Sequence, residues 1–365
     1  MNDLSALPKI SAVDLFCGAG GLTHGLIRGG IAVRAGVDLD PACKYPFEAN
    51  NAAKFIERDV NDLSAKDLLP YFPEEEISLL AGCAPCQPFS SYSQGDRGKK
   101  RGLDWQLVSS FGKLVETLQP TLVTMENVPQ LAGHAVFKEF IASLAGYKVS
   151  WSIVECSKIG IPQTRRRLVL LASKLGRDKL FIPETLGPPL TVRQTIGKLP
   201  PIQAGQQHPK DPLHFASSLN EINLQRIKAS KPGGTWRDWD PELLAECHRK
   251  DTGVTYPSVY GRMEWDAPAP TMTTQCFGYG NGRFGHPEQD RAISLREAAM
   301  IQTFPRKYKF VKKGEPVRFN ALGRLIGNAV PVRLGEVIAK TLIAHVLASR
   351  AGTEASLDDY TDTLF

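Results

Sequence analysis

A cysteine in a proline-bracketed loop is the first candidate for catalysis. Cys86 stands in Gly82-Cys-Ala-Pro-Cys-Gln-Pro-Phe-Ser90, directly after the apolar run Ile77–Ala81. Sheets of α/β proteins place their chemistry at the carboxyl ends of strands, and the basic stretch Arg97–Arg101 would favour the reactive thiolate. Cys86 is therefore a candidate nucleophile. Three alternatives remain: an inert loop cysteine, a redox pair with Cys83, or half of a zinc site. No second Cys pair or His-x₃₋₅-His completes a zinc site, so we expect no metal.

Two further segments carry charged groups suited to a polar substrate. Glu126 ends the apolar run Thr121–Met125, so its carboxyl group should face the same rim as Cys86 and could hydrogen-bond a heterocycle's ring nitrogen or amino group. In Gln163-Thr-Arg-Arg-Arg-Leu168, strand alternation places Arg165 and Arg167 on one face, where two guanidinium groups suit phosphate or carboxylate. A surface-loop glutamate and a solvated charge run are the structural alternatives.

A glycine turn near the N-terminus is typical of nucleotide binding. Gly18 and Gly20 follow the apolar run Ile10–Phe16 and precede a helical stretch. Thr23 replaces the third glycine of the dinucleotide fingerprint, which argues against a pyrophosphate. Asp38 ends the next strand, where a carboxylate can bind both ribose hydroxyls, and Asp59 could take an adenine amino group. The turn therefore predicts an adenosine-bearing cofactor without a diphosphate, although a purely structural strand–turn–helix fits the pattern too.

These residues need a sheet that brings strand ends together. Apolar runs at 10–16, 31–39, 77–81, 121–125 and 168–172 alternate with helical spacing at 22–29 and 105–118. This alternation predicts an α/β fold with a parallel sheet.

The chain changes character after about Ser173. Residues 176–290 hold 13 of the 26 prolines, which predicts a smaller, loop-rich, mostly β or irregular domain. Helical spacing returns at 295–302 and at 331–348. We therefore expect a discontinuous catalytic domain at 1–175 and 291–350, an inserted domain at 176–290, and a polar tail at 351–365.

Composition limits the class of protein. The 365 residues are 42% hydrophobic and 22% charged, which excludes a wholly disordered chain. No apolar run approaches the length of a membrane span, and the start carries no secretory signal pattern. Seven cysteines, an odd number, favour reduced thiols in the cytoplasm.

The positive charge of the chain is concentrated in a few short segments. The net charge is +6, and the 176–290 insert is neutral, with 13 basic and 13 acidic residues. Basic residues cluster instead at 97–101, 165–167 and 306–318, so a surface that neutralises a nucleic-acid backbone would lie mainly on the catalytic part.

Together, these motifs resemble those of the DNA cytosine-5 methyltransferases. The matching segments are Asp14-Leu-Phe-Cys-Gly-Ala-Gly-Gly21, Pro85-Cys-Gln87, Glu126-Asn-Val128, Gln163-x-Arg165-x-Arg167 and Gly327-Asn-Ala-Val-Pro331, in the family's order. The resemblance covers about 10–175 and 291–345. It implies a Rossmann-like methyltransferase domain with a mixed, mostly parallel sheet, and 176–290 as the variable target-recognition domain.

The resemblance also implies roles for matching positions. Cys86 would be the nucleophile, and Glu126, Arg165 and Arg167 would hold a flipped cytosine. S-adenosylmethionine would contact Phe16, Gly18, Gly20, Asp38, Asp59, Val60, Pro85, Leu107 and Asn328. We expect Gln87, Ser90, Arg97, Arg101 and Thr271 to contact DNA, with the Ser90–Arg101 loop closing over the base. Arg296-Glu297 resembles the motif that supports the recognition domain.

The expected activity is methylation of a specific double-stranded DNA site by a monomer, in a bacterial restriction-modification system with a companion restriction endonuclease. An RNA cytosine-5 methyltransferase would share the catalytic motifs but lack the large insert. The motifs also admit a non-catalytic DNA-binding protein or a thiol-redox protein. Arg237, Arg262 and Arg283 are candidates for reading base edges.

Overall fold

The computed structural model describes residues 7–85, 103–176, 180–250 and 256–351. The chain divides into two compact units, each built from separate segments. Unit 1 contains Met1–Glu155, Arg166–Leu186 and Val330–Phe365, and unit 2 contains Cys156–Arg165 and Gly187–Ala329. Residues 291–329 thus pack within unit 2, whereas the domain division predicted from the sequence groups them with the catalytic part; that division stays a prediction.

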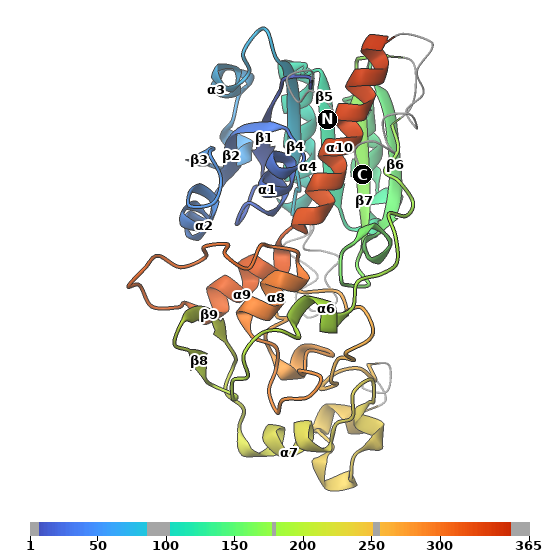
Figure 1. Ribbon diagram of the computed structural model, residues 1–365. Helices are drawn as coiled ribbons and strands as arrows, with labels where there is room; N and C mark the ends of the chain where they lie inside the picture. Colours follow the sequence, from blue (N-terminus) through green and yellow to red (C-terminus); the bar gives the residue numbers. More distant parts are fainter. Residues whose placement is uncertain (1–6, 86–102, 177–179, 251–255, 352–365) are drawn as a thin grey trace. The chain divides into compact units, whose positions relative to one another are not determined.

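A seven-stranded sheet organises unit 1 in the order β3-β2-β1-β4-β5-β7-β6 (Figure 1). Its strands are β1 (Ile10–Leu15), β2 (Ala32–Asp38), β3 (Lys54–Glu57), β4 (Ile77–Gly82), β5 (Leu122–Asn127), β6 (Lys148–Glu155) and β7 (Arg166–Ser173). The first five strands pair in parallel, and β7 runs antiparallel to both neighbours. The mixed, mostly parallel sheet confirms the predicted fold class.

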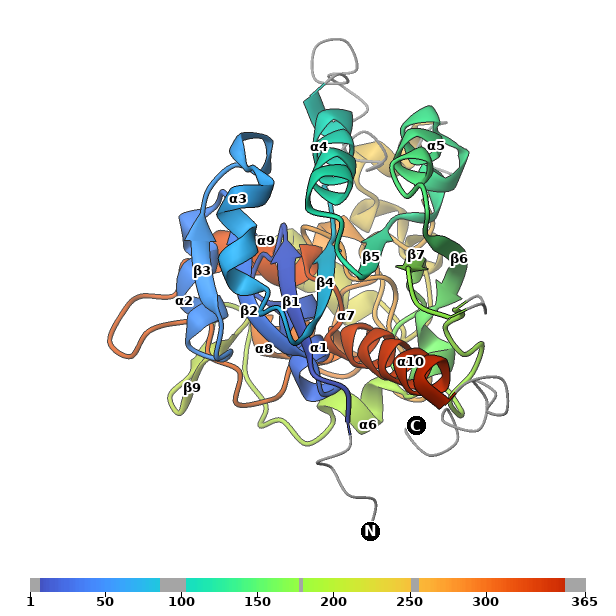
Figure 2. The ribbon, with the colours of Figure 1, turned by 90° about the horizontal axis from the view of Figure 1, so that it is seen from above.

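Helices cover both faces of this sheet, which explains why β1 and β5 are buried at every residue. Figure 2 shows α4 (Leu103–Leu118) and α5 (Ala135–Ala142) on one face and α1 (Gly21–Arg28) with α10 (Val332–Ala351) on the other. Phe111 of α4 packs edge-on against Phe140 of α5, with ring centroids 5.0 Å apart. The short helices α2 (Lys44–Glu48) and α3 (Ala65–Leu68) complete unit 1.

Helices α1 and α10 approach closely because each carries a glycine at the contact. A Cβ placed on Gly25 would lie 2.2 Å from the carbonyl oxygen of Val332 and 2.7 Å from Cα of Gly335. Backbone fills this space, so no side chain can be accommodated at residue 25.

Unit 2 contains little regular structure, as its proline content predicts. Its elements are α6 (Val192–Ile196), β8 (Gln207–His208), β9 (Asp211–Phe215), α7 (Glu221–Ala229), α8 (Leu295–Ile301) and α9 (Phe319–Asn328). The two strands form an antiparallel hairpin.

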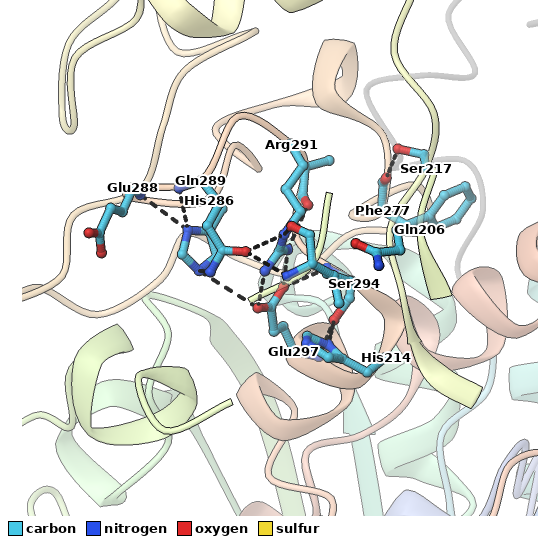
Figure 3. A network of polar contacts seen from close by, with 12 residues as sticks. Gln206, His214, Ser217, Phe277, His286, Glu288, Gln289, Arg291, Ser294 and Glu297 are labelled. Carbon is cyan, nitrogen blue, oxygen red and sulfur yellow. Dashed lines mark hydrogen bonds and ion pairs between the residues drawn. The ribbon is translucent and has the colours of Figure 1, made fainter. Parts of the chain in front are cut away.

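A buried polar network surrounds the start of α8 (Figure 3). Arg291 donates to both oxygens of Glu297, at 2.7 Å each, and the two side chains are 0% and 1% exposed. His286 Nε2 lies 3.7 Å from Glu297, and His214 Nδ1 lies 2.8 Å from the hydroxyl of Ser294, the N-cap of α8. Although burial raises the pKa of Glu297, the hydrogen bonds and charge of Arg291 bring it to about 2.

Among the described residues, no helix is both long enough and apolar enough to cross a bilayer.

Candidate active site

The carboxyl ends of four neighbouring strands meet at one rim of the unit 1 sheet. Leu15, the last residue of β1, pairs with Val37 of β2 and with Gly82 of β4, and Gly82 pairs with Met125 of β5. The strand order reverses at β1. The chain runs from β1 to β2 and β3 on one side of it, and then returns to form β4 on its other side. Ligands of open α/β sheets bind at such a switch point.

The loop after β1 has the tight geometry that the glycine motif predicts. Phe16, Gly18 and Gly20 have φ values of 59°, 53° and 86°, and a Cβ on Gly18 would meet nothing within 4 Å. The N–H of Gly18 donates to Asp38 Oδ2 at 2.9 Å, and the N–H of Asp40 donates to Oδ1 at 2.9 Å. Because a carboxylate oxygen accepts two hydrogen bonds, Asp38 is oriented and retains acceptor capacity for two hydroxyls.

Asp14 lies beneath this loop, 1% exposed. Thr23, at the position of the missing third glycine, donates its hydroxyl to Asp14 Oδ2 at 2.6 Å. Burial raises the pKa of Asp14 to about 7 against the opposing effect of the Thr23 hydrogen bonds. Asp14 Oδ1 has no hydrogen-bond partner in the part of the chain that the structure describes.

The residues predicted at the adenine are held by a 3₁₀ turn at Val60–Asp62. Asp59 caps this turn by accepting from the N–H of Asn61 at 2.9 Å, and Val60 is 3% exposed. Ser110 of α4 donates to Asn61 Oδ1 at 2.7 Å, which ties the turn to the helix that carries Leu107. A cavity of about 620 Å³ opens beside Val60, but Asp38, Gly18 and Pro85 do not line it. Among the predicted cofactor residues, Val60 alone lines this cavity.

These features fit an adenosine-bearing cofactor that is held at the ribose. Gly18 leaves room for close approach, Asp38 presents an oriented carboxyl group, and Val60 offers an apolar surface for a base. The predicted cofactor residues of unit 1 thus come from the loop after β1, the end of β2, the segment after β4, helix α4 and the Val60 turn.

Glu126 is buried, so the surface-loop interpretation is wrong. It is 2% exposed at the carboxyl end of β5. Arg167 Nε lies 2.8 Å from Oε1, and the thiol of Cys83 donates to Oε2 at 2.8 Å. A neutral donor thus orients Oε2, whereas Oε1 lies beside a cation and accepts no hydrogen bond from the described residues, so it keeps acceptor capacity for a ligand.

The segment that leads to Cys86 is anchored to the same strand. Asn127 Nδ2 donates to the carbonyl oxygen of Ala84 at 3.0 Å, so this hydrogen bond holds the backbone at Ala84 beside the end of β5. The predicted site residues Cys86, Gln87, Ser90, Arg97 and Arg101 lie outside the described residues.

Arg165 and Arg167 have different partners. Strand β7 begins at Arg166, so Arg165 precedes the strand instead of alternating within it. Arg165 is 4% exposed and donates from Nη1 to the carbonyl oxygen of Met272 at 2.8 Å within unit 2. Arg167 contacts Glu126 within unit 1, and Arg166 is exposed.

In unit 2, the segment 271–274 connects several predicted site residues. Thr271 Oγ1 donates to the carbonyl oxygen of Thr164 at 3.4 Å, and Thr274 Oγ1 donates to Asn328 Oδ1 at 2.8 Å. Gln163 accepts from the N–H of Met272 at 3.1 Å. Sequence reasoning placed Gln163 in a motif without a role, and Thr274 was missed because nothing in its local sequence marks the contact with Asn328.

Arg262 is not accessible to a base edge. It is 4% exposed, and its Nε and Nη1 donate to the backbone carbonyls of Ile227, Ser230, His286 and Gln289. Its Nη2 is paired with Asp290. The arginine therefore holds unit 2 together, and the prediction that it reads DNA is wrong. Arg283 donates to the carbonyl oxygen of Gly234 at 2.8 Å but remains partly exposed.

Comparisons with known proteins agree on one family. Residues 10–344 match the family described as C-5 cytosine-specific DNA methylase. The chain is 53% identical to the Type II methylase M.HgiDII of Herpetosiphon aurantiacus over 91% of this chain and 94% of that protein. It is 29% identical to the Type II methyltransferase M.Sau96I of Staphylococcus aureus over 91% of this chain and 75% of that protein.

Solved structures share the fold. One is a protein encoded within an E. coli prophage, with 22% identity and a TM-score of 0.71 over 93% of this chain and all of that one. Another is the methyltransferase EhMeth of Entamoeba histolytica, with 14% identity and a TM-score of 0.62 over 93% of this chain and 99% of that one. Because the family match spans most of the sequence and a methylase of 53% identity aligns along nearly all of it, the chain belongs to the C-5 cytosine-specific DNA methylases.

Proposed function

We propose that this enzyme methylates C5 of one cytosine in a specific duplex DNA site, through a transient bond between Cys86 and C6 of the base. The observation that carries the proposal is the buried Glu126 carboxyl group, fixed between Cys83 and Arg167 at the end of β5. Glu126 ends β5, and the loop that contains Cys86 follows the neighbouring strand β4. A buried, oriented carboxyl group at this place suits the binding of a flipped base.

The chemistry assigns a task to each residue. C5 of cytosine is too weak a nucleophile by itself, so the Cys86 thiolate adds to C6 and its electron pair forms the C6–S bond. The displaced π electrons make C5 enamine-like, and Glu126 stabilises the adduct by protonating or hydrogen-bonding N3 and by accepting a hydrogen bond from the exocyclic amine. S-adenosylmethionine supplies an electrophilic methyl group when bound. C5 would take that methyl group and leave S-adenosylhomocysteine as the product. A base would then remove the C5 proton, the electrons of the C5–H bond would re-form the C5–C6 double bond, and the C6–S bond would break to release the Cys86 thiolate.

The remaining predicted residues orient the two ligands. Asp38, Asp59 and Val60 would bind the nucleoside of the cofactor, with Phe16, Gly18, Gly20, Pro85, Leu107 and Asn328 completing the site. Arg165 and Arg167 would hold the base and the carboxyl group that faces it. Gln87, Ser90, Arg97, Arg101 and Thr271 would contact DNA near the extruded nucleotide.

We further propose that the enzyme is a monomer in the bacterial cytoplasm that protects host DNA against a companion endonuclease. Its 53% identity to a Type II methylase supports this setting. Protection is tested by expressing the chain in a methylation-free host and sequencing 5-methylcytosine genome-wide. The proposal requires one short motif to be methylated; methylation scattered without a motif would contradict it.

The decisive experiment compares Cys86→Ser with the wild type. We expect the variant to lose transfer of a tritiated methyl group to duplex DNA while it still binds S-adenosylmethionine. A duplex with 5-fluorocytosine at the target should trap a denaturation-resistant complex with the wild type only, because fluorine does not leave as a proton does. Normal transfer by Cys86→Ser would refute the mechanism, and transfer to tRNA in preference to DNA would assign the enzyme to RNA.

A further inference from the structure

A groove in unit 2 gathers positive charge from two segments that are about a hundred residues apart in the sequence. The β8–β9 hairpin supplies Lys210, and the segment after α8 supplies Arg306, Lys307 and Lys309. Together they line a cavity of about 600 Å³, and all four side chains are exposed. We call this feature the basic groove.

The carboxylate in the groove does not cancel these charges. Asp211 receives two hydrogen bonds from Arg296, at 2.8 and 3.0 Å, so its charge is matched by an arginine that is itself mostly buried. Although burial raises the pKa of Asp211, the hydrogen bonds and charge of Arg296 bring it below its usual value. Among the described residues, no carboxylate forms an ion pair with Lys210, Arg306 or Lys307.

Buried aromatic rings fix the backbone that presents the cations. Phe304, Tyr308 and Phe310 are at most 4% exposed, and their ring centroids lie 4.7 to 5.1 Å apart. Arg296 also donates to the carbonyl oxygen of Tyr308 at 3.3 Å. The basic residues alternate with these anchored rings, so their backbone is ordered before any ligand binds and binding incurs a smaller loss of entropy.

We propose that the basic groove binds the phosphodiester backbone of duplex DNA without reading its sequence. The inference rests on the proposed function, since it deepens the DNA-binding role of the enzyme. Cations that line one groove from two separate segments suit a run of phosphates better than a single compact anion. The groove lies outside the residues predicted to hold the flipped base, so it contributes affinity and register but no chemistry.

The test is the salt dependence of DNA binding by Lys210→Gln/Lys307→Gln. The control is Lys138→Gln/Lys148→Gln, which removes the same charge from exposed positions of unit 1. Each lost phosphate contact reduces the magnitude of the slope of log K against log salt concentration by about 0.9. The groove variant, which lacks two cations, should therefore have a slope smaller in magnitude by about 2 and an affinity at least about tenfold lower at low salt. The loss should be equal for target and non-target duplexes.

Turnover separates this proposal from the proposed function. With saturating DNA, the groove variant should methylate at the wild-type rate, with a raised KM for DNA only. A slope equal to that of the control would overturn the groove proposal while wild-type methylation continued to support the function. Wild-type protein that binds DNA without methylating it would contradict the function alone. A thermal shift by inorganic phosphate that the groove variant loses, with its DNA slope unchanged, would assign the groove to a small anion and overturn the proposal.

Discussion

At the scale of single residues, the most informative contact is the one between Cys83 and Glu126. The sequence places Glu126 correctly at a strand end, because its apolar run marks the strand. It does not reveal the contact with Cys83, because that contact depends on the register in which Gly82 of β4 pairs with Met125 of β5. Long-range pairing of this kind has no local signal.

This contact makes a prediction that separates transferase from redox chemistry. Cys83→Ala removes one donor to a buried carboxyl group, so methyl transfer should fall about three- to tenfold, the effect of one net hydrogen bond. Cys83→Ser retains a donor and should recover most of the activity. The measurement is kcat on target duplex. Loss of activity as complete as that of Cys86→Ala would favour the thiol-redox alternative.

At the scale of elements, predictability follows the hydrophobic pattern. Strands β1, β2, β4, β5 and β7 are found where apolar runs predict them, within a few residues. Strand β6 was missed because it lies at the sheet edge and its burial is broken, and its antiparallel partner β7 follows without an intervening α-helix.

Helix α9 was missed for a different reason. Gly323 and Gly327 are typical of loops, yet a Cβ on Gly323 would lie 2.1 Å from the ring of Phe277 and one on Gly327 would lie 2.0 Å from the carbonyl oxygen of Thr273. These glycines serve close packing, which propensity does not encode.

The glycine contact between α1 and α10 gives an element-scale prediction. Gly25→Ala forces a methyl group into backbone, so the helices must separate, and the free energy of unfolding should fall by about 2–3 kcal/mol. Gly133→Ala is the control, because Gly133 is exposed and its Cβ would meet nothing within 4 Å; it should change stability by less than about 0.5 kcal/mol. Denaturant titration measures both. Equal stability of the two variants would contradict the packing argument.

At the scale of the whole molecule, the two units have buried groups whose titrations act in opposite directions. In unit 1, burial raises the pKa of Asp14 to about 7, so Asp14 contributes stability below pH 4 that is lost as the pH rises through 7. In unit 2, burial lowers the pKa of His286 to about 4, so His286 contributes stability above pH 6.5 that is lost as the pH falls through 4.

We therefore expect protection of the two units against hydrogen exchange to respond oppositely to pH between 4 and 7. Lowering the pH should decrease the free energy of unfolding of unit 2, by up to about 1.4 kcal/mol per pH unit for one group. The same change should increase the free energy of unfolding of unit 1 through the protonation of Asp14. The measurement is exchange corrected for intrinsic rates, without cofactor. Asp14→Asn should flatten the unit 1 response, and parallel responses of both units in the wild type would refute the assignment.

The pairing of α1 with α10 has a consequence for synthesis. The first helix packs against the backbone of Val332 and Gly335 at Gly25, so this contact forms only when residues beyond 331 have been made. A nascent chain on the ribosome therefore carries the glycine loop long before the helix that supports it. Unit 1 completes this packing only after α10 has been made, so chains terminated before residue 332 lack it even though the residues proposed for catalysis have been translated.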